Sequence, residues 1–178
     1  MHPTLTIRPE TAEDIPSIRV VVHAAFERSS EADLVDALRR ADALIFSSVA
    51  DILGRIVGHV AFSSVTIGGR HLALALAPLA VVPDCQRQGI GAALTRWSLD
   101  ECRRSGHGVV IVLGGPAYYR RFGFTPASQF GIQCPFAVPS EEFMALELSP
   151  GSASGYRGIV RYRPEFELVW PDDGNHAV

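Results

Sequence analysis

The chain has 178 residues and a formal net charge of -3, with 47% hydrophobic and 20% charged residues. This length and composition are typical of one globular domain and exclude disordered, collagen-like and coiled-coil proteins. The 16 basic residues are all arginines and form no run, so together with the acidic excess they argue against a nucleic-acid partner.

The cysteines and the N-terminus indicate a cytoplasmic protein. Cys85, Cys102 and Cys134 are an odd number without a Cys-x-x-Cys pair, so we expect neither a disulfide framework nor a metal site. The N-terminus carries no basic and apolar signal segment, and the longest apolar run, 72–82, is too short to span a bilayer as a helix. We therefore expect no membrane partner.

The first part of the chain is expected to form a strand, two helices and two strands. Two segments have apolar residues at helical spacing, and each follows residues typical of helix N-termini. Two β-rich apolar segments come next, with turns at 51–54 and 68–69. The expected elements are a strand at 5–8, helices at 15–26 and 29–40, and strands at 43–50 and 55–67.

A strand, a loop, a helix and a second strand follow. The nearly continuous apolar run 72–82 is typical of a central strand, but Pro78 cannot donate a hydrogen bond there, so we expect the strand to splay. After a polar loop at 83–91, a helix at 92–105 and a strand at 109–113 complete a right-handed βαβ unit with parallel strands. Later segments, such as 158–162, alternate β-like pieces with turns.

The turn before the expected helix reads Gln86-Arg87-Gln88-Gly89-Ile90-Gly91. Glycines let successive N–H groups point into one concavity at the positive end of a helix, which forms an anion cradle. Arg87 adds a fixed positive charge suited to a pyrophosphate. A Gly-x-Gly turn alone is equally typical of an ordinary tight turn, and neither a P-loop nor a dinucleotide fingerprint is present.

Residues 86–91 resemble Gln/Arg-x-x-Gly-x-Gly/Ala, the acetyl-CoA signature of the GNAT superfamily of acyl-CoA N-acyltransferases. Residues 119–124, Tyr-Arg-Arg-Phe-Gly-Phe, resemble the family's Tyr-x-x-x-Gly-Phe, and the element order over 5–130 fits. Residues 76–81 and 143–148 resemble the YhbS-like group of predicted N-acetyltransferases. The resemblance implies an α/β (α+β), GNAT-like three-layer fold. Its central sheet is mixed and mostly antiparallel, with a parallel, splayed βαβ pair at the acyl-CoA site.

The resemblance also implies the organisation of the chain. A single N-acetyltransferase (GNAT) domain would cover residues 1–178. Its motif-bearing part would be 1–130, strands within 131–170 would shape the acceptor side, and 171–178 would form a tail.

Binding residues follow from the motif match. The backbone of Leu79, Ala80 and Val81 would pair with the pantetheine arm of acetyl-CoA, and an N–H near Leu79 would polarise the thioester carbonyl. The pyrophosphate would bind the amides of Arg87, Gln88, Gly89, Ile90, Gly91 and Ala92.

Tyr119 is similar to the family's general acid toward the departing CoA thiolate. Full proton transfer from a phenol to a thiolate is uphill by about 2 kcal/mol, so a role as hydrogen-bond donor is favoured unless the site lowers the phenol pKa. The alternative is that the Tyr119 ring only packs.

The general base stays open, because many relatives carry a carboxylate on the central strand and 72–82 has none. Candidates are His59, Glu31 and a bound water, although a lone strand histidine is more typical of a core. The implied function is acetyl transfer from acetyl-CoA to an amine of an unidentified acceptor, a small molecule or a peptide N-terminus. The alternative is a catalytically weak CoA-binding sensor or assembly module. The sequence is compatible with a homodimer.

The absence of lysine makes one outcome testable. No side-chain amine can be acetylated, so after incubation with acetyl-CoA mass spectrometry should find a stable acetyl amide at the N-terminal amine at most. A stable internal acetyl amide would contradict this prediction. A thioester on Cys85 would be distinguished by its loss on hydroxylamine treatment.

Overall fold

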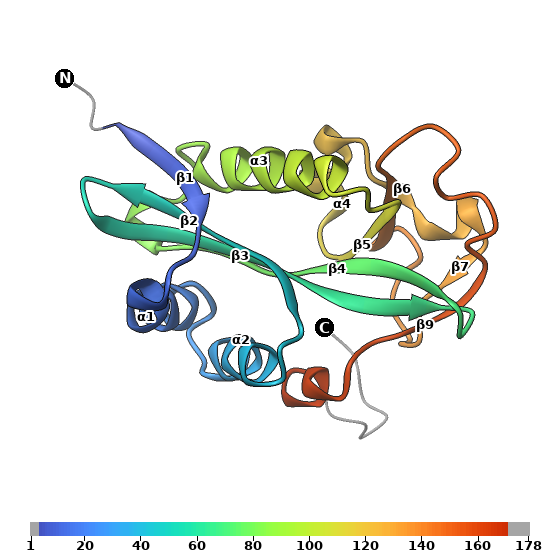
Figure 1. Ribbon diagram of the computed structural model, residues 1–178, viewed down its shortest axis with the longest axis horizontal. Helices are drawn as coiled ribbons and strands as arrows, with labels where there is room; N and C mark the ends of the chain where they lie inside the picture. Colours follow the sequence, from blue (N-terminus) through green and yellow to red (C-terminus); the bar gives the residue numbers. More distant parts are fainter. Residues whose placement is uncertain (1–3, 171–178) are drawn as a thin grey trace. The chain divides into compact units, whose positions relative to one another are not determined.

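The computed structural model describes residues 4–170, which form two compact units (Figure 1). The first unit comprises residues up to 63 and 77–101, and the second comprises 64–76 and the chain from 102 onward. Strands β3 (Arg55–Ile67) and β4 (His71–Val81) and helix α3 (Ile90–Arg104) each contribute residues to both units. The expected tail at 171–178 lies outside the described residues, and a single domain over 1–178 stays a prediction.

Two helices of the first unit form where the sequence predicts them. Helix α1 (Ile15–Phe26) follows a capping box between Thr11 and Asp14, and helix α2 is Ser30–Arg40. Each helix buries one apolar face, and full burial of such side chains contributes about 1.5–3 kcal/mol each. The buried apolar residues are Ile18, Val21 and Val22 on α1 and Ala32, Leu34, Val35 and Leu38 on α2.

The strands of the first unit lie between two helical layers. Strands β1 (Leu5–Pro9), β2 (Leu44–Ile52) and the first part of β3 pair antiparallel in that order, and β4 lies next to β3. Figure 1 shows α1 and α2 on one side of these strands and α3 on the other. A Cβ on Gly58 of β3 would lie 2.8 Å from Leu94 Cδ1 of α3, so the missing side chain lets α3 pack closely.

The second unit continues the pairing with shorter strands. Parallel pairing of β4 with β5 (Val109–Leu113) includes Leu74 and Ala75, ahead of Pro78. Strand β8 (Phe143–Glu147) pairs antiparallel with β5 and with β6 (Thr125–Pro126). The remaining strands are β7 (Ile132–Gln133), which pairs parallel with β9 (Gly158–Arg161), and β9 also pairs antiparallel with the end of β3.

The nine described strands form a mixed, mostly antiparallel sheet with four α-helices, so the expected fold class is confirmed. Three details differ from expectation. Helix α3 begins at Ile90 rather than at 92, and Asp51 belongs to β2 because it pairs with β3. Strands β6, β7 and β8 had not been assigned individually. No helix among residues 4–170 is long and apolar enough to cross a membrane.

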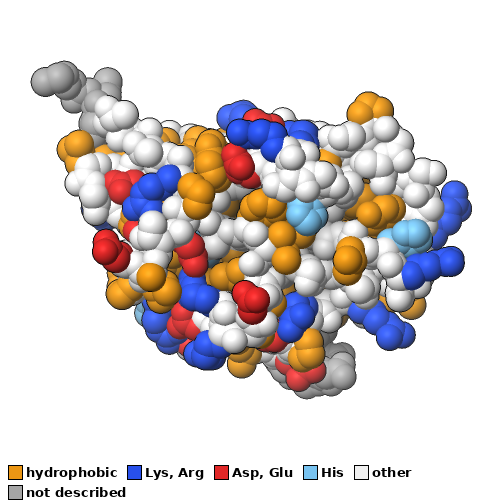
Figure 2. Space-filling model, viewed as in Figure 1, with side chains coloured by type: hydrophobic (Ala, Val, Ile, Leu, Met, Phe, Trp, Pro, Cys, Tyr) orange, Lys and Arg blue, Asp and Glu red, His pale blue; other side chains and the backbone are white. Residues whose placement is uncertain are grey.

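Charged side chains are paired across the elements of the first unit. Figure 2 shows basic and acidic side chains interspersed over α1 and α2, at the lower left. Arg19 of α1 bridges Asp33 and Asp36 of α2, with nitrogen-to-oxygen distances of 2.6 Å to each. Such exposed pairs contribute little stability, typically about 0–1 kcal/mol, but they leave no single-sign patch on this surface.

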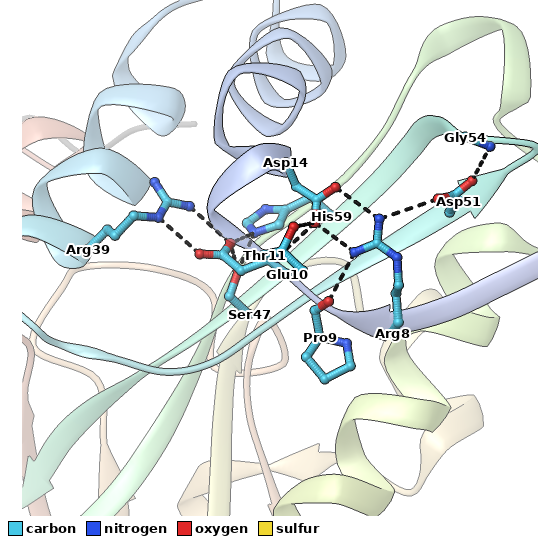
Figure 3. A network of polar contacts seen from close by, with 10 residues as sticks. All are labelled: Arg8, Pro9, Glu10, Thr11, Asp14, Arg39, Ser47, Asp51, Gly54 and His59. Carbon is cyan, nitrogen blue, oxygen red and sulfur yellow. Dashed lines mark hydrogen bonds and ion pairs between the residues drawn. The ribbon is translucent and has the colours of Figure 1, made fainter.

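Arg8 ties β1 to the residues before α1 (Figure 3). Its guanidinium donates to both oxygens of Asp14, at 2.6 and 2.9 Å, and to Asp51 of β2, at 3.3 Å. Asp14 also accepts from the backbone and the hydroxyl of Thr11. The hydrogen bonds from Arg8 and Thr11 outweigh burial and lower the pKa of Asp14, so this carboxylate stays ionised.

A second network joins α2, β2 and β3 through Glu10 (Figure 3). Arg39 donates to both Glu10 oxygens, at 3.0 Å each, and the Ser47 hydroxyl also binds Glu10. His59 Nε2 lies 2.8 Å from Ser47 Oγ and 3.7 Å from Glu10 Oε2. Burial opposes ionisation of Glu10, but the nearby His59 ring and the hydrogen bonds from Arg39 and Ser47 prevail and lower its pKa to about 2.

Protonation of Glu10 should therefore lower the free energy of unfolding at acidic pH. Its pKa falls from 4.5 unfolded to about 2 folded, so its stabilisation is complete above pH 4.5 and is lost as the pH falls toward 2. We expect Glu10→Gln to lower the free energy of unfolding at pH 7 by about 1–3 kcal/mol and to flatten its decline in that window. Denaturant titrations from pH 2 to 7 measure this.

The matched control is Glu13→Gln, because Glu13 is exposed on the neighbouring 3-10 helix. This control should follow the wild-type curve. Identical pH dependence of the Glu10 and Glu13 variants would contradict the assignment of the acid response to the Glu10 network.

Candidate active site

The first turn of α3 offers backbone donors to an anion. Gly89 has a φ of +85°, a conformation that favours glycine, and its carbonyl accepts the Ala93 N–H at 2.9 Å. Because this bond is the first of the α-helical pattern, the N–H groups of 90–92 lie ahead of it, at the positive end of the helix. The turn therefore has the local backbone geometry that an anion-binding site requires, and its use as one stays a prediction.

Two glutamine side chains brace the loop that leads into this turn. Gln86 Nε2 donates to the carbonyl of Val81, and Gln88 Nε2 donates to the carbonyl of Asp84, each at 3.0 Å. Gln88 is expected to bind through its backbone amide, and its side chain supports the loop. Arg87 is exposed with a φ of +60°, so its guanidinium extends from a turn whose backbone is fixed on both sides.

Cys85 in the same loop behaves as a structural thiol. Burial, followed by the nearby Asp84 carboxylate, raises its pKa, which keeps the thiol protonated at neutral pH. Asp84 itself pairs with Arg55 of β3 at 3.0 Å. These contacts agree with the interpretation of Cys85 as a loop residue rather than a nucleophile.

The last residues of β4 lie against β3. Ala80 is buried, and its carbonyl lies 3.3 Å from where a Cβ on Gly58 would be. Just beyond β4, Val82 donates to the Val57 carbonyl at 3.0 Å. The expected pantetheine segment, Leu79 to Val81, therefore continues directly into the loop that forms the cradle, and both belong to the first unit.

Tyr119 belongs to the second unit, at the end of helix α4 (Pro116–Tyr119). Its side chain packs edge-on against Tyr118 and Phe124, with ring centroids 5.0 and 5.6 Å away. Burial, and to a smaller extent Tyr118, raises its pKa, so the phenol stays protonated. Its hydroxyl has no hydrogen-bond partner within 4–170, so its proton is available to a ligand.

Gly114 makes room for the Tyr119 ring. A Cβ on Gly114 would lie 2.6 Å from Tyr119 Cε2, closer than real Cβ contacts, whereas a Cβ on Gly115 would meet nothing within 4 Å. Many family members carry an asparagine before this helix, and the sequence offers glycines instead. The close approach gives Gly114 a packing role that the sequence alone did not indicate.

The candidate general bases differ in their surroundings. Glu31 is buried on α2 and is held by Arg28, whose Nε lies 2.9 Å from Glu31 Oε1, and by the Ser30 hydroxyl. His59 on β3 is completely buried, and burial lowers its pKa despite the Glu10 carboxylate beside it. Glu31 is thus a paired carboxylate, whereas His59 is a neutral imidazole at pH 7.

The described residues contain no group of three or more His, Cys, Asp or Glu side chains that could hold a metal ion. Sequence reasoning named His59 but missed Glu10, Ser47 and Arg39, which contact it or each other. These four residues are far apart in the sequence, so no local spacing could have revealed the network.

Comparisons with known proteins identify the family of the chain. A family model described as an acetyltransferase (GNAT) domain matches residues 6–127. The chain is 35% identical over 164 residues to the uncharacterised N-acetyltransferase YhbS of Escherichia coli K12, covering 91% of this chain and 98% of YhbS. It is 39% identical over 134 residues to the uncharacterised N-acetyltransferase YjhQ of the same strain, covering 72% and 74% of the two chains.

Two crystal structures of GNAT acetyltransferases show the same fold. YhbS from Escherichia coli in complex with CoA has a TM-score of 0.90 and 33% identity, covering 94% of each chain. An acetyltransferase from Brucella melitensis in complex with acetyl-CoA has a TM-score of 0.79 and 36% identity, covering 93% of this chain and 99% of that one. The chain therefore belongs to the GNAT family of acyl-CoA-dependent N-acyltransferases and is similar to YhbS.

Proposed function

We propose that this enzyme transfers the acetyl group of acetyl-CoA to an amine of a small molecule or a peptide N-terminus by direct attack. The observation that carries the proposal is the open first turn of α3, where Gly89 leaves the N–H groups of 90–92 ahead of the helix bonds. Two similar GNAT proteins were crystallised with CoA or acetyl-CoA.

Each part of the cofactor has an assigned partner in this proposal. The amides of Arg87, Gln88, Gly89, Ile90, Gly91 and Ala92 hold the pyrophosphate, and the Arg87 guanidinium adds charge. The backbone of Leu79, Ala80 and Val81 pairs with the pantetheine arm as an added strand. An N–H near Leu79 stabilises the developing oxyanion.

Tyr119 acts on the leaving group. Because burial raises its pKa above that of an ordinary phenol, transferring its proton to a CoA thiolate costs more than about 2 kcal/mol. Tyr119 therefore stabilises the departing thiolate by donating a hydrogen bond, and the thiolate takes its proton from water.

The acceptor must be neutral when it attacks. At pH 7, deprotonating an α-amine of pKa about 7.8 costs about 1 kcal/mol, whereas an alkylamine of pKa about 10.4 costs about 4.6 kcal/mol. Residues 72–82 carry no carboxylate that could assist, which favours α-amino or similarly weakly basic acceptors. We propose a cytoplasmic setting, and the sequence stays compatible with a homodimer.

Binding of CoA is tested at Gly89. Valine cannot adopt a φ of +85° without strain, so Gly89→Val should redirect the N–H groups and weaken CoA binding at least tenfold. Calorimetry on the folded variant measures this, with Gly69→Val as the matched control, because Gly69 has a φ of +74° and open space in the turn between β3 and β4. Unchanged CoA affinity in Gly89→Val would remove the assignment.

Turnover is tested through Tyr119 and Gly114. Tyr119→Phe should slow thiol release by roughly 10- to 1000-fold while CoA binding persists. Gly114→Ala should also slow turnover, by about 10-fold or more, because its Cβ displaces the Tyr119 ring, whereas Gly115→Ala should match the wild type. Thiol release with a panel of amines provides the assay.

Two results would contradict these roles. Equal rates for Gly114→Ala and Gly115→Ala would show that the position of the Tyr119 ring is unimportant. Tight CoA binding without thiol release for any amine would favour the alternative, a CoA-binding sensor or assembly module, which the lack of a carboxylate on β4 supports.

A further inference from the structure

We propose that His59 is the general base of the acetyl transfer, accepting the amine proton on Nδ1 while Ser47 and Glu10 hold its ring in the reactive tautomer. This inference rests on the proposed function, because it assigns a step of that reaction. It is carried by the position of His59 on β3, its hydrogen bonds and its unpaired ring nitrogen.

The position of His59 places it beside the expected acyl-carrying strand. Its neighbour Gly58 faces α3, since a Cβ there would contact Leu94, and it abuts the Ala80 carbonyl. Successive side chains of a strand point to opposite faces, so His59 lies on the face away from α3. The bond from Val82 to the Val57 carbonyl places this part of β3 alongside the end of β4.

The hydrogen bonds determine the tautomer. The Glu10 carboxylate is ionised and can only accept, so the Ser47 hydroxyl must donate its proton to Glu10. Ser47 Oγ is then the acceptor for His59 Nε2, which must carry the ring proton across the 2.8 Å contact. In a neutral imidazole, the other nitrogen is consequently a bare acceptor. His59 Nδ1 therefore carries no proton, and its lone pair can accept one.

This free nitrogen is buried and unpaired. His59 is 0% exposed, and Nδ1 has no hydrogen-bond partner within residues 4–170. Burying an acceptor without a partner is unfavourable, and an amine N–H would satisfy Nδ1. Because the ring is fully buried, the amine reaches Nδ1 only when the side chains that cover the ring move aside. Burial also keeps the ring neutral and able to accept a proton at neutral pH.

Two charged groups act on His59 from the elements around it. Glu10, which follows β1, lies 3.7 Å from Nε2 and stabilises the imidazolium that forms when Nδ1 is protonated. Arg39 of α2 opposes that charge, but it is itself bound to both Glu10 oxygens. The arrangement matches the logic of catalytic triads, in which an acid orients a histidine and supports its charged form.

The reaction balances with these groups. The neutral amine attacks the thioester carbonyl, a C–N bond forms, and the nitrogen becomes positively charged. His59 Nδ1 takes one proton from that nitrogen, and the C–S bond breaks to release the CoA thiolate. Water then removes the proton from His59 and protonates the thiolate, so the products are the acetyl amide and free CoA.

The test uses the whole protein, acetyl-CoA and glycinamide, a small α-amine. His59→Gln places an amide NH₂ near Nε2, so it can still donate to Ser47 but has no basic nitrogen. We expect kcat at pH 8 to fall about 100-fold, with CoA affinity unchanged. In both proteins the rate should still rise with pH through the pKa of glycinamide itself, because only the neutral amine attacks. Below that limb, the acid limb that the wild type owes to His59, with an apparent pKa below 6.5, should disappear in the variant.

Two further variants complete the test: one is a control, and the other tests the proposal even if His59→Gln does not fold. Ser63→Ala is the control, because Ser63 is another buried, unpartnered side chain on the same face of β3, and it should leave kcat and the acid limb unchanged. Ser47→Ala removes the link to Glu10, and it should lower kcat about 3- to 10-fold and shift the acid limb. This second variant carries the test if His59→Gln does not fold.

Nitrogen-15 NMR of labelled histidine tests the tautomer without any acceptor. Protonation of His59 at Nε2 at pH 7 supports the proposal, and protonation at Nδ1 overturns it. A His59→Gln enzyme that folds, keeps kcat within twofold and retains the acid limb would also overturn it. Absence of thiol release from the wild type with every amine, despite CoA binding, would instead refute the proposed function.

Discussion

The first turn of α3 leaves backbone N–H groups outside the helical hydrogen-bond pattern because Gly89 accepts the first helical hydrogen bond and turns the chain at a φ of +85°. The preceding loop is held by side-chain amides bonded to the carbonyls of Val81 and Asp84, so the donors are fixed before any ligand arrives. Preorganised donors bind an anion without paying for reordering. In the proposed mechanism, chemistry at the thioester depends on holding the cofactor there.

Burial has opposite consequences for the two groups assigned to proton chemistry. It raises the pKa of Tyr119 and lowers that of His59, so both side chains are neutral near pH 7. A neutral phenol can donate a hydrogen bond to a thiolate, and a neutral imidazole can accept a proton from an amine. Glu10 remains charged because Arg39 and Ser47 bind it and the His59 ring lies nearby. The proposed mechanism thus combines two neutral reactive groups with one fixed charge.

Local sequence patterns predicted the elements that form from local interactions. Helix α1, strand β3 and strand β5 begin and end where their apolar periodicity and turn residues indicate. The start of α3 was expected at 92, because Gly91 suggested a loop although it lies in the first helical turn. Short strands such as β7 were not assigned, because two residues carry no periodicity and pair only through tertiary contacts.

The sequence indicated only those parts of the candidate site that are contiguous in the chain. The turn at 86–91 is a contiguous motif, so its spacing indicated a candidate site, whereas Glu10, Ser47 and His59 meet only after β1, β2 and β3 assemble. The role of Gly114 depends on one ring contact that no pattern encodes. Sequence therefore reveals groups that act through neighbouring backbone, and three-dimensional packing is needed for side chains brought from distant segments.

The account is tested most directly by amide NMR of the labelled protein during a titration with CoA. The amide resonances of residues 87–92 should shift most, because their N–H groups bind the pyrophosphate, while those of 30–32 at the start of α2 should stay in place. Large shifts at the start of α2 with none at 87–92, or no shifts at saturating CoA, would contradict the proposed binding site.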